Sequence, residues 1–202
     1  MKKLLMLATL ALSSSNLWAY GVGVSTYPLM TDKKLVTAEM TGITSTGGGM
    51  GLQARYSQKM NSALLLDAGV GLGAGDRSNR IFAGADYEIF PDYMNQPRFS
   101  IKTSLANARE FEKRRNILSM APILSKGFSF WGEEAFPFIA VPVGLSLESG
   151  SKTYETLVSV SLGVTGNLPI EGYRHLAANI EGTINVKDSY SGIFMGLSYP
   201  ID

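Results

Sequence analysis

The chain has 202 residues, of which 45% are hydrophobic, and its 18 Lys and Arg nearly balance its 17 Asp and Glu. A formal net charge of +1 gives no reason to expect a nucleic-acid partner. The lack of cysteine excludes disulfides, thiolate metal sites and a lipid anchor on an N-terminal cysteine.

The first 19 residues predict a secretory signal peptide. Lys2 and Lys3 are followed by an apolar run over residues 4–12 and later by the small residue Ala19, after which cleavage is expected. The apolar run is about half of the roughly 20 residues that a membrane-spanning helix needs, which disfavours an N-terminal anchor. Residues 20–202 then have the length of a single domain.

The rest of the chain consists of short segments in which apolar and polar residues alternate, separated by turn-forming stretches such as "AGDRSN" and "PDYMNQP". Regular short strands joined by turns are typical of an antiparallel sandwich or barrel. The segments are approximately 21–27, 35–43, 50–58, 63–73, 81–90, 98–108, 116–127, 135–148, 155–168, 174–186 and 190–199.

The two faces of these strands are unlike. In "IFAGADYEIF" (81–90), an apolar row begins at Ile81, and the opposite row contains Asp86 and Glu88. The same contrast recurs in 64–72, where an uncharged row opposes Asp67. Apolar rows of this length match the roughly 9–11 residues with which a tilted strand crosses a bilayer. We therefore expect the Ile81 face to meet lipid and the Asp86 face to line a lumen.

The predicted lumen face combines charges of both signs with many glycine, alanine and serine residues. A narrow lumen needs a few large charged groups that pair, with small residues beside them, whereas a sheet face in water would carry long polar side chains throughout. The predicted lumen charge network is Glu39, Arg55, Asp67, Asp86, Glu88, Arg98, Lys102 and Glu181.

Aromatic residues gather near the ends of the segments, as they do in the interfacial girdles of membrane barrels. They are Tyr27, Tyr56, Tyr87, Phe90, Tyr93, Phe128, Phe130, Trp131, Phe136, Tyr154, Tyr173, Tyr190 and Tyr199.

Signal peptide, strand pattern and girdles together resemble the small outer-membrane β-barrel proteins of Gram-negative bacteria. The resemblance covers residues 20–202 and implies an all-β fold, an antiparallel up-and-down transmembrane β-barrel in the outer membrane. It also implies contact with outer-membrane lipid, lipopolysaccharide and the barrel-assembly machinery. One departure is the C-terminus, because this class commonly ends its last strand on an aromatic residue and here residues 200–202 follow Tyr199. About 18 residues per strand and turn predict about ten strands, with eight or twelve open.

Nothing in the sequence predicts catalysis, a cofactor or a metal site. His175 is the single histidine and has no serine two residues away. The Asp86 and Glu88 carboxylates could do acid–base work, but salt bridges to Arg55, Arg98 or Lys102 fit a lumen better. The basic turn "REFEKRRN" (109–116) is either a solvated loop or a contact for lipopolysaccharide phosphates or periplasmic partners.

Pro122 and Pro142 fall in the middle of consecutive segments. Proline has no backbone N–H, so we expect strand pairing between 116–127 and 135–148 to be interrupted or bulged there. This interruption is either structural or a lateral seam that admits lipid. The favoured function is a non-enzymatic structural barrel or narrow pore. The alternatives are a lipid-handling enzyme or transporter that uses this seam, and a soluble periplasmic barrel that binds an apolar ligand.

Overall fold

The computed structural model describes residues 23–24, 27–31, 33–45, 48–73, 77–130, 132–150 and 153–201, so the expected signal peptide (1–19) lies outside the described residues. The described chain forms only strands and turns, and no helix in it is long and apolar enough to cross a membrane. The strands are β1 (Lys34–Ile43), β2 (Gly49–Lys59), β3 (Leu64–Gly73), β4 (Arg77–Phe90), β5 (Arg98–Glu110), β6 (Lys113–Ser125), β7 (Phe128–Phe130), β8 (Glu133–Ala140), β9 (Val143–Glu148), β10 (Tyr154–Asn167), β11 (Ala177–Lys187) and β12 (Gly192–Ile201).

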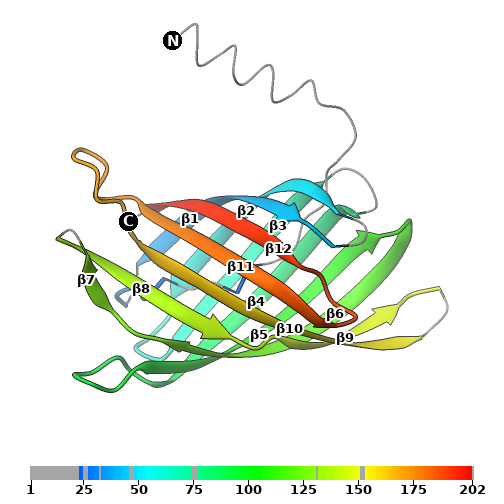
Figure 1. Cartoon of the computed structure of the whole chain (residues 1–202), viewed down its shortest axis with the longest axis horizontal. Helices are drawn as coiled ribbons and strands as arrows, with labels where there is room; N and C mark the ends of the chain where they lie inside the picture. Colours follow the sequence, from blue (N-terminus) through cyan, green and yellow to red (C-terminus); the bar gives the residue numbers. More distant parts are fainter. Residues whose placement is uncertain are drawn as a thin grey trace, which may run out of the picture.

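The strands close into an antiparallel barrel (Figure 1). β1 to β6 pair in chain order, and so do β10, β11 and β12. β12 pairs with β1, and β8 and β9 lie between β6 and β10 and pair with both. β8 and β9 are two halves of one barrel strand, since both pair with β6 in one unbroken register, from Met120↔Val143 to Ile123↔Ala140. β7 pairs with β8 alone, at one rim. The barrel therefore has ten strand positions, which confirms the predicted number.

One predicted segment is not a strand. Ten of the eleven alternating segments correspond to the ten strand positions, but the described residues of 21–27 are outside any strand. Gly23 is instead buried inside the barrel, and Val24 packs against its inner wall. The alternation of this segment therefore predicted a strand wrongly. Gly23 and Val24 contact polar and apolar groups of the lumen without pairing with any strand of the wall.

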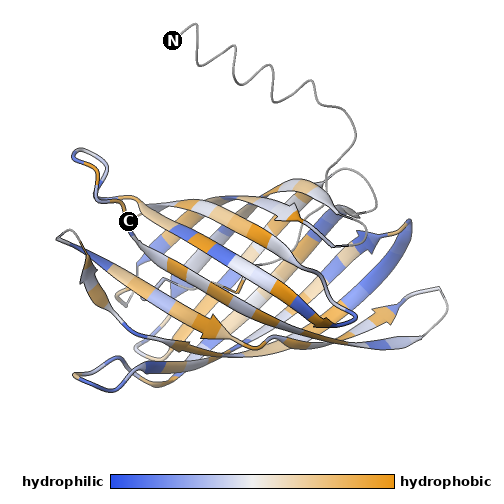
Figure 2. Cartoon of the chain, viewed as in Figure 1, coloured by the Kyte–Doolittle hydropathy of each residue, from blue (hydrophilic) through white to orange (hydrophobic). Residues whose placement is uncertain are grey.

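Apolar and polar residues alternate along the strands (Figure 2), and the exposed side chains of the wall are largely apolar while the buried ones are largely polar. Ile81 is 66% exposed, whereas Phe82 and Asp86, on the other face of β4, are 3% and 1% exposed. The period-two rows thus point as predicted, because successive side chains of a strand alternate between its faces. We call the outward apolar rows the apolar belt; its members include Val70, Ile81, Leu105, Leu118 and Leu145.

Glycines make room for the large side chains inside. Gly69 is directly opposite Phe82, and a Cβ on Gly69 would lie 2.5 Å from Phe82 Cζ. Gly163 is opposite Phe138 in the same way, with a Cβ position 2.6 Å from Phe138 Cζ. Glycine is needed at both positions because any side chain would overlap the phenylalanine ring, and the closed wall leaves that ring no room to move.

The two prolines interrupt the ladder on both sides of the β8–β9 junction. Val141 N donates to Pro122 O at 3.2 Å and Ser159 N donates to Pro142 O at 3.0 Å, but neither proline can donate in return. The predicted interruption between 116–127 and 135–148 is therefore present. The predicted bulge there is wrong, because the register is unchanged, and the nearby irregularity lies between β10 and β11 at Val158/Ser159.

Of the predicted girdle aromatics, Trp131 lies outside the described residues, Tyr27, Phe136 and Tyr190 are half-buried, and the others are on the surface. Tyr27 and Phe136 pack edge to face with ring centroids 6.0 Å apart, in the interior beside Asn167, to which the Tyr27 hydroxyl donates. Assigning these two rings to a girdle was wrong, because Tyr27 belongs to the segment inside the barrel.

Candidate functional site

All eight residues of the predicted charge network point into the lumen. Seven of them are at most 5% exposed, and the side chain of Glu88 is 16% exposed. They come from six strands: Glu39 from β1, Arg55 from β2, Asp67 from β3, Asp86 and Glu88 from β4, Arg98 and Lys102 from β5, and Glu181 from β11.

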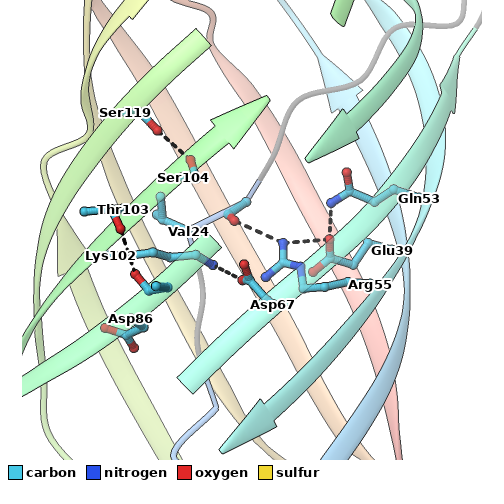
Figure 3. A network of polar contacts seen from close by, with 12 residues as sticks. Val24, Glu39, Gln53, Arg55, Asp67, Asp86, Lys102, Thr103, Ser104 and Ser119 are labelled. Atoms are coloured by element: carbon cyan, nitrogen blue, oxygen red, sulfur yellow. Dashed lines mark hydrogen bonds and ion pairs between the residues drawn. The ribbon is translucent and has the colours of Figure 1, made fainter. Parts of the chain in front are cut away.

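The first group surrounds Arg55 (Figure 3). Its Nη2 lies 3.0 Å from Glu39 Oε2, and Gln53 donates a second hydrogen bond to the same oxygen. The guanidinium also lies 5.7 Å from the centre of the Phe82 ring, within cation–π range. Arg55 further donates to the backbone oxygen of Gly23 at 3.0 Å, so this group holds a segment that is not part of the wall.

The second group surrounds Arg98. Its Nη2 lies 2.8 Å from Asp86 Oδ2, and its Nε lies 2.6 Å from Glu88 Oε2. Lys59 Nζ is 3.9 Å from the same Glu88 oxygen. One guanidinium therefore binds both carboxylates of the Asp86/Glu88 pair, an arrangement typical of salt bridging.

A third pair reaches over a strand. Lys102 of β5 and Asp67 of β3 meet at 2.7 Å, although β4 lies between their strands. Directly opposite Asp67 in β4 is Gly84, where a Cβ would collide with the Asp67 carboxylate. The missing side chain at Gly84 is what leaves room for this pair.

Gly23 and Val24 lie inside the lumen and are not part of its wall. Val24 N donates to Glu181 Oε1 at 3.1 Å, and the Val24 side chain packs against the buried cluster of Ala121, Ile123, Phe138 and Ala140. With the bond from Arg55 to Gly23 O, charged side chains satisfy one buried carbonyl and one buried amide of this segment. We call Gly23 and Val24 the plug; it was not predicted from the sequence, although an eleventh alternating segment is one too many for an even-numbered barrel.

Two inward cations were also missed. Lys59 and Arg80 are each 5% exposed and share the inward rows of Arg55 and Asp86. They were overlooked because the predicted segments began one residue late at 81 and ended one residue early at 58, whereas the strands extend further. They bring the lumen closer to electrical balance.

Little space remains inside. One internal cavity, between Val24 and Pro142, has a volume of about 70 Å³, and another, beside Tyr27 and Asp67, has about 30 Å³. Each has room for a few water molecules at most. A wider cavity of about 430 Å³ opens at the distal rim, which we define as the rim opposite Lys34 and Ile201; it contacts Tyr190.

The opposite rim is tied by Asp92, which lies in the connection between β4 and β5. Its carboxylate accepts hydrogen bonds from Lys126 Nζ and, at 2.6 Å, from the Gly127 amide. Partial desolvation by itself would raise the pKa of Asp92, but these two bonds outweigh it and hold the pKa below its ordinary value of 3.8. This ionised side chain links two connections that are far apart in the sequence.

The described residues contain no group of three or more His, Asp or Glu side chains that could hold a metal ion. His175 lies edge-on against the Tyr199 ring, with centroids 5.9 Å apart. The absence of catalytic residues stays a prediction.

No protein-family model and no curated protein matches this chain. A solved structure described as "De novo design of transmembrane beta-barrels" is similar over 87% of this chain and 100% of its own, with 12% sequence identity and a TM-score of 0.42. The strand pairing, and not this likeness, establishes that the chain is a closed barrel.

Proposed function

We propose that the protein is a non-enzymatic β-barrel of the Gram-negative outer membrane, exported by the signal peptide at 1–19. Its lumen is closed by the charge network and the N-terminal segment, so its resting role is structural and not that of an open pore. In this proposal the barrel-assembly machinery inserts the chain, and outer-membrane lipid and lipopolysaccharide surround it. The observation that supports it best is that the outer face of the wall is apolar and the lumen contains ion pairs, the reverse of a soluble protein.

The apolar belt supports the membrane location. Val70, Ile81 and Leu105 are among many large apolar side chains that are more than half exposed. A soluble monomer rarely shows a contiguous apolar patch larger than roughly 600 Å². In a bilayer the same surface needs no cover, and closure of the barrel satisfies the backbone groups that lipid cannot.

The interior disfavours the soluble ligand-binding alternative. Apolar ligands bind in cavities of about 300–1,000 Å³ lined mainly by apolar side chains. The internal cavities here have about 70 and 30 Å³, and charged groups such as Lys102 and Asp67 line them.

The lipid-handling alternative rests on the interrupted ladder at Pro122 and Pro142. The cavity directly behind Pro142 has only about 70 Å³, which is too small for an acyl chain and a reacting headgroup. The interruption is therefore better explained as a structural consequence of two missing N–H donors.

The test is insertion of the refolded full chain into phospholipid vesicles, followed by gel mobility with and without heating and by bilayer conductance. We expect a heat-modifiable, protease-protected protein with little conductance. Val70→Arg, within the apolar belt, should oppose insertion by about 2–4 kcal/mol, whereas Asn79→Arg, outward at the distal rim, should cost about 0–1 kcal/mol. Recovery of the wild type as a lipid-free monomer would refute the membrane location, and a large steady conductance would refute the closed lumen.

A further inference from the structure

Two arginines lie directly opposite each other on the outer face of the β5–β6 hairpin, at the distal rim. Arg109 and Arg114 are partners in the strand register, and both are exposed. Like charges at directly opposite positions destabilise a sheet. Among the described residues neither guanidinium forms an ion pair, and the carboxylates of Glu148 and Glu155, which are on the inward rows of their strands, are bound to Lys113 and Arg115. This arrangement leaves two adjacent positive charges without an anion.

A groove in the outer face begins next to these arginines. It has a volume of about 890 Å³ and extends across β3, β4, β5, β6 and β9. Its floor contains Ala68 and Ala83, which are directly opposite each other and too small to fill the space between Ile81 and Leu105. The outer wall is thus hollowed where two neighbouring strands both present alanine.

Polar side chains connect the groove to the arginines. Asn107 and Asn116 line the end of the groove and are joined by a hydrogen bond of 2.7 Å. Arg114 Nη1 donates to Asn107 Oδ1 at 3.1 Å, which holds that guanidinium at the mouth of the groove. The side chains along the outer face are therefore apolar in the groove, amides at its end and cationic at the rim. A phospholipid has the same order, from its apolar acyl chains to its charged headgroup.

We propose that this groove and the arginine pair bind one phosphorylated lipid, an inference that rests on the proposed membrane location. An acyl chain fills the hollow over Ala68 and Ala83, and the phosphate lies between Arg109 and Arg114. Guanidinium groups bind phosphate oxygens through paired N–H donors, and a shared phosphate removes the repulsion between the two cations. The rim is also the level at which headgroups meet a barrel.

A second outer groove provides an internal comparison. It has about 800 Å³, lies over β12, β1, β2 and β3, and is also floored by alanines, Ala38 and Ala54. Neither groove has Lys or Arg in its lining, but only the first is lined by Asn107, to which Arg114 donates. It therefore offers a chain site of similar size without a cation for the headgroup.

The experiment measures lipid binding to the folded full chain in neutral detergent by native mass spectrometry. The probes are phosphatidic acid, which has chains and phosphate, diacylglycerol, which has chains alone, and glycerol 3-phosphate, which has phosphate alone. We expect phosphatidic acid to bind about tenfold more tightly than diacylglycerol, and glycerol 3-phosphate to bind weakly, since a basic side chain near an anionic headgroup contributes modestly on its own.

Variants separate the two parts of the site. Arg109→Gln with Arg114→Gln should abolish the preference for phosphatidic acid, and Arg109→Lys with Arg114→Lys should retain only part of it, because lysine lacks the guanidinium fork. Ala83→Leu should fill the groove and weaken phosphatidic acid without changing the charge. The controls are Ala54→Leu, in the other groove, and Arg174→Gln with Lys187→Gln, which removes two charges elsewhere; both should bind as the wild type does.

Equal binding of phosphatidic acid and diacylglycerol, or undiminished binding by the Arg109/Arg114 glutamine variant, would overturn the proposal. So would glycerol 3-phosphate that binds as tightly as phosphatidic acid, because the groove would then contribute nothing. Vesicle insertion is measured on the same preparations. A wild type that inserts but does not discriminate refutes this inference alone, whereas one that fails to insert refutes the proposed function.

Discussion

Replacement of Arg55 by alanine tests whether the lumen is a dry charge network. The substitution leaves the Glu39 carboxylate with Gln53 but without its cation, and it removes the donor to Gly23 O. It also empties the space over the Phe82 ring. The perturbation therefore acts on the wall and on the plug at once.

The magnitude follows from burial. The side chains of Arg55 and Glu39 are 4% and 1% exposed, so the carboxylate that remains cannot reach bulk water. Removal of one partner from a buried pair costs about 3–5 kcal/mol, whereas an exposed pair contributes about 0–1 kcal/mol. The exposed pair of Arg174 and Glu133, at 3.2 Å, is a matched control, since the Arg174 side chain is 64% exposed.

The assay is urea unfolding of the vesicle-inserted protein, with the free energy of unfolding obtained from the midpoint and slope. We expect Arg55→Ala to lower it by about 3–5 kcal/mol and Arg174→Ala by about 0–1 kcal/mol. Adding Glu39→Gln to Arg55→Ala should recover part of the loss, because the stranded charge is then gone. If Arg55→Ala costs no more than Arg174→Ala, the lumen is hydrated and the charges do not close it.

Three further predictions concern the plug, the packing and the rim. Deletion of residues 20–29 behind an intact signal peptide should raise bilayer conductance several-fold, and an unchanged conductance would mean that the wall charges alone close the lumen. Gly163→Val should cost about 1–3 kcal/mol in urea unfolding through overpacking, whereas Gly42→Ala, whose Cβ position is 4.0 Å from its nearest neighbour, should cost much less. The pKa of Asp92 is lowered in the folded state, so its contribution of about 1 kcal/mol is present above its ordinary value of 3.8 and is lost as the pH falls below it. A pH series of unfolding should show this loss in the wild type and not in Asp92→Asn, and parallel curves for the two proteins would mean that the bond to Lys126 contributes nothing.

The direction of each wall side chain could be predicted from the sequence. Alternation is a local property of an extended chain, so the row of Ile81 and the row of Asp86 were separable without knowledge of any partner strand. The number of wall strands followed from the same pattern, and even the ladder defect at Pro142 was predictable, because proline lacks an N–H wherever it lies.

Which charges meet could not be predicted in this way. Arg55 pairs with Glu39 of the neighbouring strand, Arg98 binds two carboxylates at once, and Lys102 passes over Gly84 to reach Asp67 two strands away. These choices depend on register, on closure and on the space that glycines leave, all of which are relations between distant parts of the chain.

The sequence by itself thus determined a two-faced wall of about ten strands, because that information lies in the spacing of neighbouring residues. Only the tertiary structure decided that Gly23 and Val24 lie inside the lumen and not in a strand of the wall. Gly23 and Val24 lie in the lumen because three partners bind them there. Arg55 donates to the Gly23 carbonyl, Glu181 accepts from the Val24 amide, and a small apolar cluster packs against the Val24 side chain. Those partners come together only when the barrel closes, and for that reason no local pattern could specify the plug.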